Sequence, residues 1–254
     1  MQSTNTRWLI LLLAALALAM GGCASVKYDT MSASEIYSLG VSELDEKHYD
    51  KATEAFEKLK EIHPFSVQVA QAEIRLADCY YSRREYEEAV AGFEEFLLRH
   101  PTHQEVPHAL YYLGMSNYKR MYSIDRDQAY TKEAEKYFQR VVTGHPGSDN
   151  YPEAREKLTE TRNRLAKRER YVGKFYFKQK EYYAALGRFD NIVQRYPDTD
   201  HYPEALLYAA KCQLRLGVSR EAERSLKTLL LRFPDGPFAS EARSLLKEAE
   251  SAGP

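Results

Sequence analysis

The chain offers few side-chain arrangements that could perform catalysis or hold a metal ion. Acids and hydroxyls are plentiful, but the sequence has no nucleophile elbow, phosphate-binding loop or H-E-x-x-H motif. His100 and His103 are spaced like two metal ligands, but Pro101 would break the helix that could place both rings on one face. Residues 125–127 read Asp-Arg-Asp, which we interpret as acids that cap or pin a loop and are bridged by the arginine. We predict no catalytic residue and no metal site, hence a protein that is not an enzyme.

Covalent chemistry is predicted at one cysteine, Cys23. A single arginine precedes an apolar run from Trp8 to Met20, which is too short to span a bilayer comfortably and is typical of a signal-peptide core. Two glycines then lead to Cys23, an ending that resembles a bacterial lipobox with Met20 where leucine is usual. We predict a signal peptide over residues 1–22, N-acyl and S-diacylglycerol lipid on Cys23, and a tether over residues 23–34. The alternative is a plain secretory signal with an incidental cysteine; beyond the lipid, no cofactor is predicted.

The elements that would position any binding site are helix pairs. The body of the chain shows helical periodicity, and five segments end in His, Tyr or Phe followed by proline. Each has a small residue twelve positions before the proline and large apolar residues eight and five positions before it. A further small residue, such as Gly40 or Gly114, lies upstream where the first helix meets the second. The five prolines are Pro64, Pro101, Pro146, Pro197 and Pro234. Five matches in register predict an all-α, right-handed superhelix (α-solenoid) of five tetratricopeptide-like helix pairs.

The spacing of these prolines predicts the domain organisation. Pro101 and Pro146 are eight residues further apart than the shortest repeat, which places an insertion at about 121–130. The next interval is longer still, and we interpret its excess as one long helix that begins at Pro152 and continues into repeat four. We predict repeats one to three over residues 35–150, and the long linking helix with repeats four and five over 151–250. Residues 241–250 are predicted to form a closing helix with a polar face.

Cys79 and Cys212 occupy the same place in their repeats, 22 residues before the terminal proline. That place favours small buried side chains, and three repeats separate the two thiols. We therefore predict unpaired thiols within the core rather than a disulfide.

A groove for an extended peptide is predicted on the first three repeats. Tetratricopeptide arrays line their concave side with the first helices, and Tyr37, Tyr81, Tyr111 and Met115 map onto such positions together with Asp78. Rigid amphipathic rings suit peptide binding. Ordinary packing between repeats is the alternative. The near balance of 36 basic and 37 acidic residues gives no drive towards nucleic acid.

The combined features resemble the BamD family of outer membrane protein assembly factors, from about residue 35 to 246. The resemblance rests on the lipobox, the five repeats, an Asp-Arg-Asp-Gln insertion at 125–128 and an Arg-Leu-Ala string at 164–166 of the long helix. It implies a lipid-anchored accessory of the β-barrel assembly machinery on the periplasmic face of the outer membrane. Ala24 and Ser25 after the cysteine look like an outer-membrane address.

The resemblance also implies partners. The C-terminal repeats would dock on the last periplasmic domain of a BamA-like barrel subunit, with Arg188 and Arg164 as docking residues. An arginine can bind a carboxylate through two parallel hydrogen bonds, which lysine cannot copy. The N-terminal groove would receive the C-terminal signals of unfolded outer-membrane proteins, and other Bam lipoproteins are further expected partners.

Two other functions fit the sequence less well. A periplasmic tetratricopeptide adaptor, such as a Tol-Pal coordinator, usually carries an N-terminal coiled coil, and no sustained heptads precede residue 35. A cell-wall hydrolase with helical repeats would need a catalytic constellation that the sequence does not offer.

Overall fold

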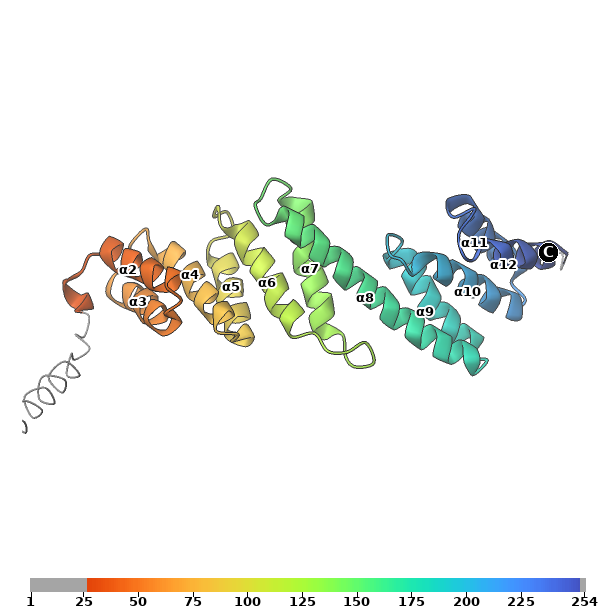
Figure 1. Ribbon diagram of the computed structural model, residues 1–254, viewed down its shortest axis with the longest axis horizontal. Helices are drawn as coiled ribbons and strands as arrows, with labels where there is room; N and C mark the ends of the chain where they lie inside the picture. Colours follow the sequence, from red (N-terminus) through yellow and green to blue (C-terminus); the bar gives the residue numbers. More distant parts are fainter. Residues whose placement is uncertain (1–26, 252–254) are drawn as a thin grey trace, which may run out of the picture.

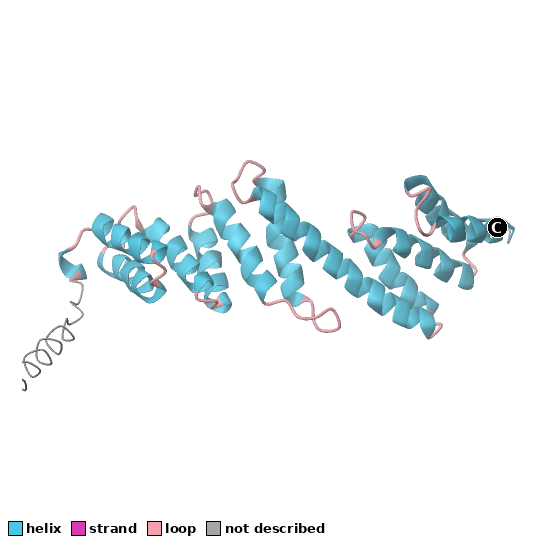
Figure 2. Ribbon diagram, in the orientation of Figure 1, coloured by secondary structure: helices cyan, strands magenta, loops and turns pink. Residues whose placement is uncertain are grey.

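The computed structural model describes residues 27–251 as an elongated row of packed helices (Figures 1 and 2). A 3-10 turn, η1 (Tyr28–Thr30), precedes eleven α-helices, and these residues form no strand. The helices are α2 (Ala33–Asp45), α3 (Tyr49–Ile62), α4 (Val69–Ser82), α5 (Tyr86–Arg99), α6 (Val106–Lys119), α7 (Ala129–Gly144), α8 (Tyr151–Lys178), α9 (Tyr182–Arg195), α10 (Tyr202–Arg215), α11 (Ser219–Arg232) and α12 (Ala239–Ser251). The predicted all-α repeat fold is confirmed. The predicted signal peptide and Cys23 lie outside the described residues.

Five helix pairs form because each second helix presses a large ring or leucine against a small residue of its first helix. Phe56, Phe138 and Phe189 are fully buried at this position. A Cβ added at Gly114 would lie 2.5 Å from the ring of Phe138, so only glycine permits this approach of α6 to α7. Alanines of the second helices, such as Ala52, are equally buried. The small and large residues that recur in the sequence thus mark the points where the two helices of each pair cross.

The turn that follows each pair has one repeated backbone geometry. In the first, the amide of Ser66 donates to the carbonyl of His63, and the amide of Val69 donates to the carbonyl of Ser66. The same pair of bonds recurs after residues 100, 145, 196 and 233. Proline, which lacks an amide hydrogen, stands where each second helix must end.

The long helix expected from Pro152 is α8, with 28 residues. Its N-terminal half buries Ala154 and Leu158 in one hydrophobic core, which reaches back to α4. Its C-terminal half buries Leu165 and Ala166 in another core, which is shared with α9 and α10. Among residues 27–251, no helix is both long and apolar enough to cross a membrane. The division into two domains at α8 stays a prediction.

Candidate protein-binding surfaces

The first helices of successive repeats pack on one another and form a layer. Close contacts join α2 to α4 and α4 to α6, and again α8 to α10 and α10 to α12. The five predicted groove residues lie on α2, α4 and α6, and all of them are partly exposed: Tyr37, Asp78, Tyr81, Tyr111 and Met115. The structure therefore places them in one layer, and their role in binding stays a prediction.

The ring of Tyr112 contacts two of the aromatic rings predicted for the groove. Its ring centroid lies 4.9 Å from that of Tyr81 and 5.1 Å from that of Tyr111, both in edge-to-face contact. It also stacks on the buried Phe93 at 6.0 Å, and Met115 packs against the same core. Tyr112 is not among the predicted groove residues, and nothing in the sequence separates it from the adjacent Tyr111 as the central ring. The result is an aromatic cluster that spans repeats two and three.

The hydroxyls of this cluster stay neutral. Burial, with a smaller effect of the neighbouring tyrosine hydroxyls, raises the pKa of Tyr81 to about 12. Burial also raises the pKa of Tyr111 and Tyr112. The aromatic faces can bind a peptide's apolar side chains, and the half-buried neutral hydroxyls can donate to its carbonyls.

Asp78 is occupied by partners within the chain. It accepts hydrogen bonds of 2.7 Å from Arg75 Nη1 and from His108 Nε2. Arg75 also donates to Glu105, at 2.8 Å. Burial alone would lower the pKa of Arg75, but the carboxylates of Asp78 and Glu105 raise it above its ordinary value. Asp78 thus fixes α4 against α6, and its predicted contact with a peptide would have to share this carboxylate.

Tyr37 stands apart from the aromatic cluster. Its ring lies 6.0 Å from that of Phe56, and it packs on the core of repeat one. Its neighbour in the layer is Arg75, whose pKa the nearby Tyr37 hydroxyl helps to raise. The predicted groove residues therefore form two groups, which the charged Arg75 connects.

A cleft that the sequence argument missed opens between α3 and α5, with α4 as its floor. Its volume is about 430 Å³. Four acids, Glu57, Glu73, Glu88 and Glu95, line it together with Lys60. The acid in its floor, Glu73, is 6% exposed and accepts from Arg99 and His100. The small residues of the repeat pattern make this space, but their spacing alone cannot show whether a side chain fills it.

The two predicted docking arginines have different surroundings. Arg188 of α9 pairs with Glu169 of α8 at 3.2 Å, and its side chain remains 46% exposed. Arg164 of α8 is less accessible, because its guanidinium donates to the carbonyl oxygen of Tyr122 in the insertion. Arg188 can thus reach a partner directly, whereas Arg164 holds the insertion against α8.

The insertion between α6 and α7 is a loop over residues 120–128, close to its predicted place. Asp127 accepts from the amide of Ala129 and so caps α7, as expected of an acid in this loop. Gln128, which is 6% exposed, donates to three carbonyls of the loop. The expectation that Arg126 bridges the two acids is wrong: its guanidinium lies 4.4 Å above the ring of Tyr122. At such an exposed site the cation–π attraction of the ring contributes about 0.5–1 kcal/mol.

Residues 29–229 match the model of one protein family, YfiO, which is described as outer membrane lipoprotein. This range begins in η1 and ends in α11, so it includes the insertion and every helix of the layer except α12. The chain belongs to the YfiO family.

Two relatives of this YfiO-family chain carry the same name, outer membrane protein assembly factor BamD. The protein of Rickettsia prowazekii is 30% identical, over 93% of this chain and 95% of its own length. That of Caulobacter vibrioides is 27% identical, over 91% of this chain and 78% of its own length. Among solved structures, the TPR2AB domain of yeast Sti1 in its pHSP90 complex has a TM-score of 0.42 and 18% identity, over 87% of this chain and 86% of that one.

Exposed rings lie on the C-terminal half of this YfiO-family chain, and the sequence argument did not single them out. Tyr171 and Phe175 are 54% and 57% exposed on α8, and Tyr183 is 78% exposed on α9. The spacing of four residues places Tyr171 and Phe175 on one face of α8. That spacing was a signal available in the sequence, since both rings lie outside the repeat positions that form the core.

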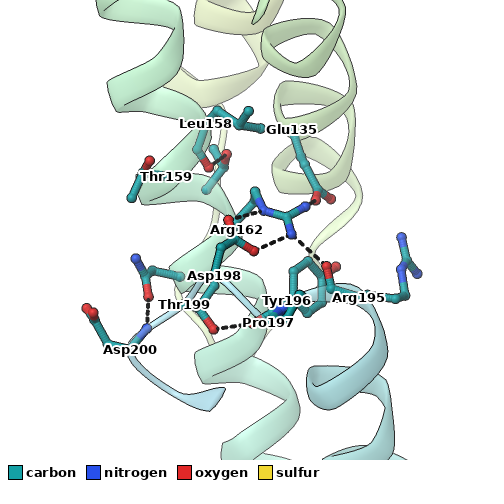
Figure 3. Close-up of polar contacts among 12 residues, drawn as sticks. Glu135, Leu158, Thr159, Arg162, Arg195, Tyr196, Pro197, Asp198, Thr199 and Asp200 are labelled. Atoms are coloured by element: carbon teal, nitrogen blue, oxygen red, sulfur yellow. Dashed lines mark hydrogen bonds and ion pairs between the residues drawn. The ribbon is translucent and has the colours of Figure 1, made fainter. Parts of the chain in front are cut away.

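A polar network braces α8 where its two cores meet (Figure 3). Arg162 donates to Glu135 of α7 at 2.9 Å, to both oxygens of Asp198 at 2.8 and 2.5 Å, and to the carbonyl of Arg195 at 2.6 Å. Burial raises the pKa of Glu135, although Arg162 opposes this effect. The hydrogen bond from Arg162 lowers the pKa of Asp198. One guanidinium therefore joins α7, α8 and the end of α9.

Two groups of side chains within residues 27–251 could be taken for metal ligands, and both have partners within the protein. His100 and His103 face each other at 6.3 Å between ring centroids, but His100 Nε2 donates to Glu73. Glu43, Glu46 and His48 approach one another near the end of α2, where Lys51 lies 3.6 Å from Glu43. Such exposed acidic groups are common in surface salt bridges, and this one has its own cation.

The predicted core thiols are confirmed. Cys79 and Cys212 are both unpaired and fully buried. Burial raises the pKa of each thiol to about 12. A thiolate is the reactive form of cysteine, so these two residues are inert near neutral pH.

Proposed function

We propose that this chain is a lipid-anchored assembly factor that helps to receive and insert outer-membrane β-barrel proteins. The observation that carries the proposal is the relation to a protein named outer membrane protein assembly factor BamD, which is 30% identical over nearly the whole of both chains. That shared name favours this function over the coordinator of the Tol-Pal system. The chain would act as a scaffold, through surfaces rather than through a catalytic residue.

The anchor would be lipid on Cys23, which would hold the protein on the periplasmic face of the outer membrane. The variant Cys23→Ser lacks the thiol that would carry the lipid, so it should remain as soluble, unlipidated protein in the periplasm. Protein that still fractionates with membranes would contradict the anchor.

The docking surface would be the C-terminal half, with Arg188 at its centre. The partner would be the periplasmic domain of a BamA-like barrel subunit, and a carboxylate of that domain would replace or share Glu169 at the guanidinium. Other Bam lipoproteins could bind elsewhere on the array. Arg164 would contribute indirectly, because it holds the insertion loop in place beside α8.

The test of docking is recovery of the barrel subunit from detergent-solubilised outer membranes. We expect wild-type protein to recover it, and Arg188→Ala and Arg188→Glu to lose most of that recovery. The alanine variant matters because the glutamate would lie beside Glu169. Arg140→Glu, the same charge reversal at an exposed position of α7 outside the C-terminal half, should bind normally. Failure of the wild type to recover the subunit would refute the function, and normal binding by Arg188→Ala would refute the surface alone.

The receiving surface would be the layer of α2, α4 and α6. Its aromatic cluster would hold apolar side chains of unfolded outer-membrane proteins, in particular of their C-terminal signals. Titration of such a signal peptide against Tyr81→Ala and Tyr111→Ala should give several-fold weaker affinity than the wild type, and Leu98→Ala on α5 should not. Equal affinities would assign these rings to packing between repeats.

A further inference from the structure

The turn between α3 and α4 presents two apolar side chains to solvent. Phe65 is 99% exposed and Val67 is 85% exposed, so neither contributes to any core. A single exposed apolar residue is common on protein surfaces, but here two of them form the tip of one tight turn. The tip is therefore a small apolar surface that residues 27–251 leave without a partner.

The fold itself does not require apolar residues at these two positions. All five repeat turns have the same two backbone hydrogen bonds, so positions 65 and 67 have equivalents in each of the other four. The equivalents are polar, glycine or proline: Thr102 and Gln104, Gly147 and Asp149, Asp198 and Asp200, Asp235 and Pro237. The same backbone thus forms four times without a large apolar side chain at either position. The apolar tip of the first turn serves something other than folding.

This turn lies beside the segment that leads to the proposed lipid. His63 Nε2 donates to the carbonyl oxygen of Met31 at 2.9 Å, which ties the turn to the residues that follow η1. Tyr28 of η1 is 8% exposed and packs in the core of repeat one. Only four residues lie between Cys23 and Tyr28, and five fully extended steps of the chain span at most roughly 18 Å. Lipid on Cys23 would therefore hold the first repeat close to the membrane surface.

We propose that Phe65 and Val67 insert into the headgroup region of the membrane that carries the lipid anchor. The proposal rests on the lipid anchor at Cys23. The chemistry of the turn fits a neutral phospholipid surface, because residues 61–68 hold one acid, Glu61, and no lysine or arginine. An apolar ring at a turn tip gains free energy at the boundary between headgroups and acyl chains.

A second contact would change what the anchor does. A lipid on a short tether fixes one point of the protein and leaves the array free to swing about it. Insertion of the turn fixes a second point on repeat one, while α12 lies at the opposite end of the array (Figure 1). The array would then project from the membrane in a defined direction, which would orient the first helices towards arriving chains.

The chain allows a direct test with one fluorophore. Its only tryptophan is Trp8, within the predicted signal peptide, so the mature protein would have none. Phe65→Trp places an indole at the tip of the turn, in a position with no packing to disturb. Leu231→Trp is the matched control, since Leu231 is 84% exposed on α11 near the far end. Both lipidated proteins are bound to phosphatidylcholine vesicles with and without brominated acyl chains.

We expect Phe65→Trp to show a blue-shifted emission on vesicles and strong quenching by the brominated lipid, and Leu231→Trp to show neither. Protein that floats with the vesicles while its indole at position 65 stays unshifted and unquenched would overturn the membrane contact and leave the anchor intact. Protein that does not float would refute the anchor itself. An indole that responds only when a barrel-signal peptide is added would assign the turn to a peptide and overturn the proposal.

Discussion

At the scale of single residues, the fold depends on glycines at the points where two helices cross. A Cβ at Gly114 would lie 2.5 Å from the ring of Phe138, and one at Gly40 would lie 2.5 Å from the ring of Phe56. Gly187, by contrast, has no atom within 4 Å of the place where its Cβ would be. All three glycines lie within helices, where alanine is favoured by about 1 kcal/mol. Their replacement therefore separates the cost of a helix crossing from the intrinsic preference of the helix.

We expect Gly114→Ala to lower the free energy of unfolding by about 1–2 kcal/mol, because the clash with a buried ring outweighs the helical preference of alanine. Gly187→Ala should raise it by about 1 kcal/mol. Urea unfolding followed by far-UV circular dichroism measures both changes. A gain in both variants would mean that Phe138 moves aside at little cost and that the crossing is not close-packed.

Residue types alone could locate these crossings, because small and large residues recur at fixed distances from each proline. They could not identify Tyr112 as the centre of the aromatic cluster. Tyr111 and Tyr112 are adjacent and equally plausible in the sequence, and only the rotation of α6 decides which ring meets both Tyr81 and Phe93.

At the scale of elements, α8 is the joint of the array. Its apolar contacts with one core end at Leu158 and those with the next begin at Leu165. Between them, Arg162 is 17% exposed and Glu135 is 13% exposed. A largely buried charge that loses its partner destabilises a fold strongly, whereas the intact pair contributes little net stability. The network therefore favours one arrangement of α7, α8 and α9 more than it strengthens the fold.

Arg162→Met is expected to cost about 3 kcal/mol of unfolding free energy at neutral pH, because it leaves the Glu135 carboxylate without its main cation. Burial has already raised the pKa of Glu135. A carboxyl whose pKa is raised by folding destabilises the folded chain when ionised, so its protonation favours the fold as pH falls. The cost of Arg162→Met should therefore shrink as pH falls through the folded pKa of Glu135. Urea unfolding at several pH values measures this.

Two further variants control for loss of charge. Adding Glu135→Gln to Arg162→Met should recover part of the stability, since no buried carboxylate then remains unpaired at the joint. Lys136→Met removes a cation from an exposed pair with Glu133 and should change stability by less than about 0.5 kcal/mol. A cost for Arg162→Met that does not vary with pH would show that lost packing, rather than Glu135, is responsible.

The length of α8 could be predicted from its sequence, but the contacts by which it joins α7 to the end of α9 could not. The region 151–170 has no glycine and no proline after Pro152, which is enough to indicate one continuous helix. Its many charged residues are equally compatible with a helix face exposed to solvent and with a face that contacts other helices. Arg162 binds Glu135 and Asp198, which lie 27 and 36 residues away in opposite directions, and no local pattern reports such a meeting.

At the scale of the whole molecule, stability is distributed along a row of cores. Four separate hydrophobic clusters follow one another from η1 to α12, and each is shared by neighbouring helices. In such arrays each unit contacts only its neighbours, so an angle set at one joint is carried to both ends. The joint at α8 thus decides how the proposed receiving layer faces the proposed docking surface.

The angle between the two halves of the array can be followed as a distance between two spin labels. One label is attached at Leu98→Cys on α5 and the other at Leu231→Cys on α11, which are highly exposed positions before and after α8 in the chain. In a Cys23→Ser background the native thiols should not be labelled, because burial raises the pKa of Cys79 and Cys212 to about 12. We expect a narrow distance distribution in the otherwise wild-type chain and in Lys136→Met.

Arg162→Met should broaden that distribution, because the two cores would then be joined only by the backbone of α8 and the apolar contacts on either side of the gap. Lower pH should narrow it again, as protonation of Glu135 removes the unpaired charge. A distribution that stays narrow in Arg162→Met would mean that helix packing alone fixes the angle. In that case the polar network would be a consequence of the arrangement of α7, α8 and α9 and not its cause.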